Sequence, residues 1–151
     1  MQDLLVRDAL PGEENFVYNS WLHSYRSSSF ARPIDSKTYY AFHHAVIERL
    51  LSRTTTSILI AAHAMTPDVI LGYLIVETPA TMPLGCATMP IAHFVYVKQP
   101  FRRLGIGKAL LEHLKPKLGP FSALYTHKTN DGEGLLRAIE EFKAQYNPYL
   151  I

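Results

Sequence analysis

The sequence has a single cysteine, Cys86, among its 151 residues. One cysteine cannot form an intramolecular disulfide, and this scarcity is typical of proteins in the reducing cytoplasm. Cys86 stands among prolines and a glycine, so we interpret it as incidental to any chemistry. No apolar run approaches the roughly 18 residues that a membrane helix needs, and residues 1–10 carry acids where a secretory signal would carry basic residues. We therefore expect a cytoplasmic protein without a membrane partner.

A large excess of charge of one sign is also missing, because the formal net charge is only +2. The chain therefore lacks the strongly basic character that indicates a general nucleic-acid binder. The positive charge that exists is concentrated locally. Residues 98–117 contain one acid, Glu112, and six basic residues, which are Lys98, Arg102, Arg103, Lys108, Lys115 and Lys117. This segment is predicted to contact an anion.

Apolar periodicity predicts strands and helices that alternate within one domain, residues 1–151. The content of 48% hydrophobic and 19% charged residues suits a single globular core. Strands are predicted at 4–9, 57–64, 69–78, 91–98, 121–128 and 146–151, and helices at 11–28, 36–53, 105–115 and 133–145. The order β-α-α-β-β-β-α-β-α-β predicts an α/β (α+β) fold, in which helices flank a central mixed, mostly antiparallel sheet. The strands 91–98 and 121–128 flank a helix, which indicates a parallel crossover.

The second helix is expected to bury one apolar stripe, and the second and third strands are expected to form a hairpin. Helical spacing predicts the stripe as Tyr39, Phe42, Val46 and Leu50. The hairpin turn is predicted at 66–68, where the sequence reads Thr-Pro-Asp.

The segment 101–114 reads FRRLGIGKALLEHL and directly follows a predicted strand. A strand, a glycine pair and a helix start are a common phosphate-binding arrangement, because first-turn N–H groups lack partners and the helix dipole favours anions. A Walker loop does not fit, since Ala109 stands where serine or threonine is needed and Arg102 stands where the first glycine is needed. A dinucleotide fingerprint does not fit either, since Leu110 stands at its third glycine position.

Residues 102–107 do match the pattern Gln/Arg-x-x-Gly-x-Gly/Ala. With an aromatic-valine strand end before it and an apolar helix after it, this segment resembles the GNAT superfamily of acetyl-coenzyme A-dependent N-acyltransferases. The strict motif covers about 95–114, and the order of elements extends the resemblance to most of the chain. A shorter segment, 21–26, reads WLHSYR and is similar to small GNAT-fold proteins of bacteriophages.

The resemblance implies acetyl-coenzyme A as the acyl donor. In this superfamily the N–H groups of the loop hold the coenzyme A pyrophosphate. The end of the preceding strand binds the pantetheine arm and the thioester carbonyl, and an asparagine after the next strand contacts the pantetheine. The coenzyme-binding residues expected here are Val95, Tyr96, Val97, Arg102, Arg103, Leu104, Gly105, Ile106, Gly107, Lys108 and Asn130.

Acyl transfer to an amine needs a base for the amine and a proton donor for the leaving thiolate. In the superfamily a helix tyrosine often donates this proton, but Phe142 stands near that position here. His93 is the candidate base, because it shares a strand face with a catalytic glutamate of some members and its ordinary pKa suits the task. The alternative is a structural histidine bonded within the sheet. Tyr125 is the candidate donor, or else a half-buried sheet tyrosine, and Glu77 either reaches the acceptor side or is an exposed carboxylate at a strand end.

Three functions remain open from the sequence. The leading hypothesis is an N-acetyltransferase that moves the acetyl group of acetyl-coenzyme A to a primary amine. The alternatives are a phage-type GNAT-fold enzyme that modifies an amine on a nucleobase or DNA, and a non-catalytic coenzyme A-binding module. No metal is expected, because His43, His44, His63 and His127 show no metal-ligand spacing.

The acceptor is expected to be a small-molecule amine or a nucleotide-like compound. Residues 21–44 are predicted to select it, with Arg26 and Arg32 contacting an acceptor that carries negative charge. The sequence leaves the acyl group beyond acetyl and the oligomeric state open, a homodimer included.

Overall fold

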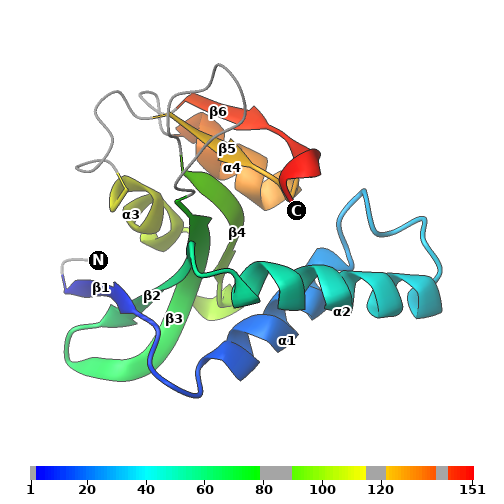
Figure 1. Cartoon of the computed structure of the whole chain (residues 1–151). Coiled ribbons are helices and arrows are strands. Elements are labelled where there is room, and N and C mark those ends of the chain that lie inside the picture. Colours follow the sequence, from blue (N-terminus) through cyan, green and yellow to red (C-terminus); the bar gives the residue numbers. More distant parts are fainter. Residues whose placement is uncertain (1–2, 79–89, 115–121, 139–142) are drawn as a thin grey trace.

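The computed structural model describes residues 3–78, 90–114, 122–138 and 143–151, and Figure 1 shows their arrangement. The strands are β1 (Leu4–Asp8), β2 (Thr56–His63), β3 (Thr66–Glu77), β4 (Ile91–Val97), β5 (Ser122–Tyr125) and β6 (Lys143–Tyr146). The α-helices are α1 (Glu14–Tyr25), α2 (Ser36–Ser52), α3 (Ile106–Glu112) and α4 (Asn130–Ala138). The order of these elements along the chain confirms the predicted order. None of the described helices is long and apolar enough to cross a membrane.

The strands form one mixed sheet whose spatial order, β1-β2-β3-β4-β5-β6, follows the sequence. The pairs from β1 to β4 are antiparallel, whereas β4 with β5 and β5 with β6 are parallel. The helices α3 and α4 connect the parallel strands, as expected for parallel neighbours, which need a crossover connection. The predicted fold class, a mixed and mostly antiparallel sheet flanked by helices, is therefore confirmed.

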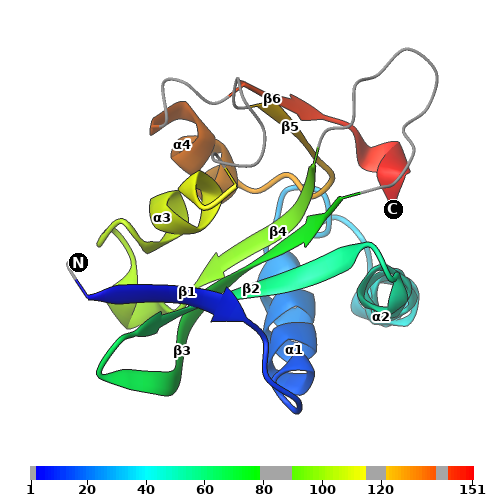
Figure 2. The same ribbon diagram turned by 60° about the vertical axis from the view of Figure 1, so that its left-hand side comes forward.

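Helices cover both faces of the sheet, with α1 and α2 on one face and α3 and α4 on the other (Figure 2). Side chains of β3 alternate between the two layers, as the period of a strand requires. Tyr73 and Ile75 belong to the core under α1 and α2, while Leu74 and Val76 belong to the core under α3 and α4. Because both faces are covered, the middle strands are apolar on both sides.

The strand β4 keeps its pairing with β3 along its whole length but leaves β5 early. Its register with β5 includes only Ile91 and Ala92. At the same point the β3–β4 ladder has an irregularity, because Val76 pairs with Ala92 and Ile75 with Phe94. His93 is therefore the extra residue of a β-bulge, a feature that bends a strand and redirects its side chains. From His93 onward the edge of β4 that faces β5 has no strand partner among the described residues.

The C-terminal boundaries differ from the predicted ones. The predicted helix at 133–145 is wrong at its end, because Lys143–Tyr146 form β6, while the described part of α4 is Asn130–Ala138. The predicted terminal strand at 146–151 is wrong beyond its first residue, because Pro148–Leu150 form a short 3-10 helix. The cause is tertiary: Lys143–Tyr146 pair in parallel with β5 over all four of its residues, and such pairing overrides the weak helical preference of a short segment.

The buried face of α2 was predicted correctly at Tyr39 and Leu50 but not between them, and the turn of the β2–β3 hairpin was predicted wrongly. The buried residues of α2 are Tyr39, His43, Ile47 and Leu50, while Phe42 is 72% exposed. The predicted and the observed set of residues both have helical spacing. The polar His43 in the observed set makes that set harder to recognise in the sequence. The hairpin turns at 64–65, and residues 66–68 belong to β3. Pro67 can lie in β3 because the register with β2 is irregular there, so its missing N–H group leaves no hydrogen bond of the ladder unmade.

We expect Gly72 to be essential for the approach of β3 to β4. A Cβ at Gly72 would lie 2.5 Å from the backbone oxygen of Tyr96, so Gly72→Ala must displace backbone. The free energy of unfolding, measured by urea denaturation, should fall by about 1–3 kcal/mol or more. Gly134→Ala is the matched control, because a Cβ at this position on α4 meets nothing within 4 Å and alanine favours a helix by about 1 kcal/mol. Equal stability of the two variants would contradict this account.

Candidate functional site

The loop between β4 and α3 contains two residues in the left-handed region. Arg103 has φ +66° and Gly105 has φ +84°. A Cβ at Gly105 would meet nothing within 4 Å, so glycine is needed there for conformation alone. Gly107 has a different reason, since a Cβ at this position would lie 2.9 Å from Leu135 Cδ2 on α4. The first glycine of the motif therefore turns the chain, and the second lets α3 pack against α4.

The basic side chains around this loop fall into two groups. Arg102 folds back onto the end of β4, where its Nε donates to the carbonyl of Val97 at 2.8 Å and its guanidinium lies 5.9 Å from the ring centre of Tyr96. Arg103 and Lys108 are exposed. Arg102 thus attaches the loop to the strand end, while the other two cations face solvent beside the N–H groups that begin α3. Lys115 and Lys117 lie outside the described residues.

A pocket opens where β4 and β5 diverge. Its lining includes Ala92, His93 and Val95 of β4, Tyr125 of β5 and Leu135 of α4. Val95 belongs to the edge of β4 that has lost its strand partner, so backbone donors and acceptors are available beside the pocket. An extended, amide-containing chain can pair with such an edge as an added strand does.

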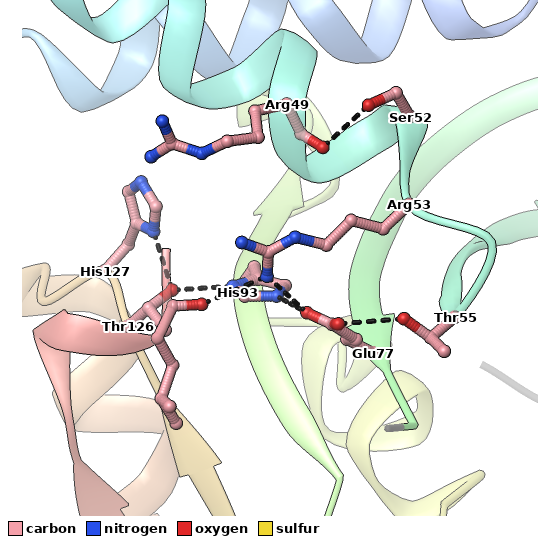
Figure 3. Close-up of polar contacts among 9 residues, drawn as sticks. Arg49, Ser52, Arg53, Thr55, Glu77, His93, Thr126 and His127 are labelled. Atoms are coloured by element: carbon pink, nitrogen blue, oxygen red, sulfur yellow. Dashed lines mark hydrogen bonds and ion pairs between the residues drawn. The ribbon is translucent and has the colours of Figure 1, made fainter. Parts of the chain in front are cut away.

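His93, which lines this pocket, makes a buried hydrogen bond with Glu77 of β3, and Figure 3 shows the polar contacts around the two side chains. His93 Nε2 lies 2.9 Å from Glu77 Oε1. The Glu77 carboxylate also accepts hydrogen bonds from Arg53 at 2.9 Å and from the Thr55 hydroxyl at 2.8 Å. The exposed fractions of Glu77 and His93 are 6% and 1%. Glu77 is therefore not the exposed carboxylate that the sequence suggested as one reading, because three donors compensate its burial.

The other nitrogen of His93 begins a chain of contacts that leads away from Glu77. His93 Nδ1 lies 2.9 Å from Thr126 Oγ1, and the same hydroxyl lies 2.9 Å from His127 Nδ1. His127 Nε2 lies 3.1 Å from His43 Nε2 on α2. All of these side chains are buried, and Figure 3 shows Thr126 between His93 and His127. We call Glu77, His93, Thr126, His127 and His43 the polar chain.

Burial is the main cause that sets the pKa values in the polar chain. It lowers the pKa of His43 to about 4 and, together with the neighbouring histidines, holds the pKa of His127 well below its ordinary value. It also lowers the pKa of His93, although the hydrogen bond that His93 donates to Glu77 opposes this. Burial alone would raise the pKa of Glu77, but its hydrogen bonds with His93, Thr55 and Arg53 outweigh burial, and its pKa lies below the ordinary value. Near neutral pH the imidazoles are therefore neutral and the carboxylate is ionised.

Comparison with known proteins identifies the fold. No family model and no curated protein sequence matches the chain, but solved structures do. A GCN5-related N-acetyltransferase from Ralstonia eutropha is 17% identical and covers 91% of this chain and 91% of its own, with a TM-score of 0.66. The chain has the GNAT fold. A ribosomal-protein-alanine N-acetyltransferase from Brucella melitensis is also 17% identical, with a TM-score of 0.52, over 95% of this chain and 80% of its own. A protein from Corynebacterium glutamicum, described as histone acetyltransferase HPA2 and related acetyltransferase, is 16% identical, with a TM-score of 0.60, over 78% and 73%.

In this GNAT fold, the predicted catalytic residues lie at the pocket. His93 and Tyr125 both line it, from β4 and β5. Burial raises the pKa of Tyr125, so its hydroxyl keeps its proton at neutral pH. Both ring nitrogens of His93 are engaged, so a base at this position must act through its hydrogen-bond partners.

The remaining predicted residues lie elsewhere. Asn130 is exposed and is the first residue of α4. Phe142 and Cys86 lie outside the described residues.

The two arginines expected at the acceptor differ in their environment. The Arg26 guanidinium donates to the carbonyl groups of Ala31 and Ile34 and lies 5.1 Å from the ring centre of Tyr39. Arg26 thus holds the connection between α1 and α2 together. Arg32 is exposed, and its contact with the Ser27 carbonyl is long, at 3.4 Å. Contact with an acceptor stays a prediction for both, and the position of Arg32 suits it better.

Sequence reasoning missed the other members of the polar chain. Thr126 and His127 follow β5 directly, and His43 lies outside the stripe of α2 that was predicted to be buried. One sequence signal was present: a Thr-His pair next to a strand end, where polar side chains often converge. The contact of His127 with His43 spans 84 positions, so no local pattern could have revealed it.

The lowered pKa values predict acid sensitivity of the folded state. An unfolded histidine binds protons near pH 6.5, whereas the folded pKa of His43 is about 4. The stabilisation is therefore fully present above pH 6.5 and is lost as the pH falls from there toward 4. The free energy of unfolding, measured by urea denaturation, should fall across this window, and less steeply in His43→Gln. His44→Gln, which replaces an exposed histidine of the same helix, is the control. A flat profile in the wild type would contradict the assignment.

Proposed function

We propose that this protein is an acetyl-coenzyme A-dependent N-acetyltransferase that acts on a primary amine. The observation that carries the proposal is the early divergence of β4 from β5. It leaves an open strand edge beside a pocket, directly before a loop with left-handed residues and exposed cations. The GNAT fold and the acetyl-transferring neighbours support it, and the acceptor is identified only as an amine.

The loop suits the pyrophosphate of coenzyme A. The N–H groups at the start of a helix lack intrahelical partners and attract anions, and the exposed Arg103 and Lys108 add positive charge there. We assign the backbone of 103–107 to the pyrophosphate and the open edge at 95–97 to the pantetheine arm. Arg102, which is bound to the Val97 carbonyl, fixes the distance between these two parts. Asn130, at the start of α4, is assigned to the pantetheine as well.

The reaction forms a carbon–nitrogen bond and breaks a carbon–sulfur bond. The neutral amine attacks the thioester carbonyl, loses one proton to a base, and the departing thiolate gains one proton. His93 is proposed to serve as the base through its hydrogen-bond partners, because its ring is neutral and both of its nitrogens are engaged, one with Glu77 and one with Thr126. Tyr125 is proposed as the donor to the thiolate, since its raised pKa keeps the hydroxyl protonated. Both residues border the pocket, which is the geometry that acid–base catalysis requires.

Acetyl-coenzyme A should raise the melting temperature of the protein, because a ligand that binds only the folded state stabilises it. Gly105→Val should abolish this increase, since a β-branched side chain strains the loop and covers its N–H groups. Gly12→Val is the matched control, because Gly12 has φ +94° and equally open surroundings but lies before α1. Differential scanning fluorimetry with and without acetyl-coenzyme A checks this. An undiminished shift in Gly105→Val would refute the assigned coenzyme site.

Turnover tests the proposed activity itself. Release of free coenzyme A thiol should occur with at least one member of a panel of primary amines and aminated nucleosides. His93→Gln should lower kcat by about 10²-fold or more, the usual scale for acid–base catalysis, with little change in the melting-temperature shift caused by acetyl-coenzyme A. A folded His93→Gln protein with wild-type kcat would show that His93 is structural and not catalytic.

A further inference from the structure

Each hydrogen bond in the polar chain has a direction that its chemistry determines. The ionised Glu77 carboxylate can only accept, so His93 Nε2 carries a proton. His93 is neutral, which leaves its Nδ1 as an acceptor for the hydroxyl proton of Thr126. A hydroxyl has one proton, so Thr126 Oγ1 must accept from His127 Nδ1. The tautomer of one histidine thus determines that of the next.

The same reasoning continues to α2. Because neutral His127 carries its proton on Nδ1, its Nε2 accepts, and the proton in that contact belongs to His43 Nε2. His43 Nδ1 then has a free lone pair and no hydrogen-bond partner among the described residues. Every donor in the polar chain therefore points toward Glu77, and the one open acceptor is at the opposite end.

We propose that the polar chain is a proton relay, with His43 Nδ1 as its open end and the Glu77 carboxylate as its terminal proton acceptor. The source of the proton, the ammonium group of the acceptor, rests on the acetyltransferase function proposed above. The directions of the hydrogen bonds do not depend on that function. His43 lies on α2 within the segment predicted to select the acceptor, which places the open end on that side of the sheet.

The proton movement balances. A proton bound by His43 at Nδ1 releases the Nε2 proton of His43 to His127 Nε2. His127 passes its Nδ1 proton to Thr126 Oγ1, and Thr126 passes its own hydroxyl proton to His93 Nδ1. His93 gives its Nε2 proton to Glu77. One proton has been taken up, one carboxylic acid has formed, and each imidazole is neutral again in the opposite tautomer.

The surroundings suit transfer along this route and not exchange with bulk water. The His43 ring is stacked between the rings of Tyr25 and Tyr39, at centroid distances of 4.9 and 5.2 Å. The His127 ring meets Trp21 edge-on at 5.1 Å. At the other end Glu77 is held by Arg53, whose side chain is 31% exposed, so this end lies near the surface. Within the described part of the chain, no three His, Cys, Asp or Glu side chains are placed to hold a metal ion.

The first test reads the tautomers by nitrogen-15 NMR of histidine-labelled protein at neutral pH, and it needs no turnover. We expect His43 and His93 to be protonated on Nε2 and His127 on Nδ1. Thr126→Val removes the hydroxyl at nearly constant shape, so His127 should lose its preference for the Nδ1 tautomer, while Thr126→Ser should keep it. His127 found with its proton on Nε2 in the wild type, or unchanged in Thr126→Val, would overturn the relay.

The second test uses turnover of acetyl-coenzyme A with an amine that the wild type accepts. Thr126→Val should lower kcat by about tenfold or more, although His93 and Glu77 remain in place, and Thr126→Ser should restore most of the rate. The KM for acetyl-coenzyme A and the melting-temperature shift that it causes should stay the same in both variants. Equal kcat in Thr126→Val and Thr126→Ser would show that the polar chain is only structural and would overturn the relay.

The two proposals fail in different ways. A wild type that releases no thiol with any amine refutes the acetyltransferase function, and the relay is then decided by the tautomers and their response to Thr126→Val.

If Thr126→Val does not fold, His43→Phe interrupts the other end of the polar chain. His43→Phe should also lower kcat, and His127 should lose its preference for the Nδ1 tautomer. A folded His43→Phe protein with wild-type kcat and an unchanged His127 tautomer would overturn the relay.

Discussion

The divergence of β4 from β5 after Ala92 opens both the pocket and the strand edge beside it. If β4 and β5 stayed paired beyond Ala92, the backbone groups at 95–97 would be hydrogen-bonded within the sheet. The pocket between the two strands would then be closed. The bulge at His93 produces the divergence, because an extra residue in one strand bends it away from its neighbour. It also turns His93 toward Glu77 and Thr126. One irregularity in the backbone thus supplies both the space for a ligand and the orientation of the polar groups beside it.

The buried carboxylate of Glu77 shows how the core tolerates this polarity. Moving an ionised carboxylate out of water costs several kcal/mol unless hydrogen bonds replace the lost hydration. Three side chains provide them, from Arg53, Thr55 and His93. The remaining members of the polar chain are each satisfied by the next, so the network is nearly complete although aromatic rings surround it. Complete polar networks in a low-dielectric core favour one arrangement of side chains over others.

The sequence predicted what depends on neighbouring residues and missed what depends on distant ones. The order of elements and the loop at 102–107 were predictable, because strand period, helix period and glycine placement are local. The buried face of α2 was predicted only at Tyr39 and Leu50, because two stripes have equal spacing and the preference for one comes from packing in the core that contains Trp21 and Tyr25. The burial of Glu77 was missed for a related reason: its partners Arg53 and His93 are 24 and 16 positions away.

Arg103 combines a strained backbone with an exposed positive charge. It is the one residue other than glycine with positive φ among the described residues, and that conformation costs an L-residue about 1–2 kcal/mol. Glycine would adopt it without cost but would carry no charge. A chain selected for stability alone would have no reason to keep arginine here. The strained backbone therefore supports the coenzyme-binding role proposed for Arg103, because strained residues are common at binding sites.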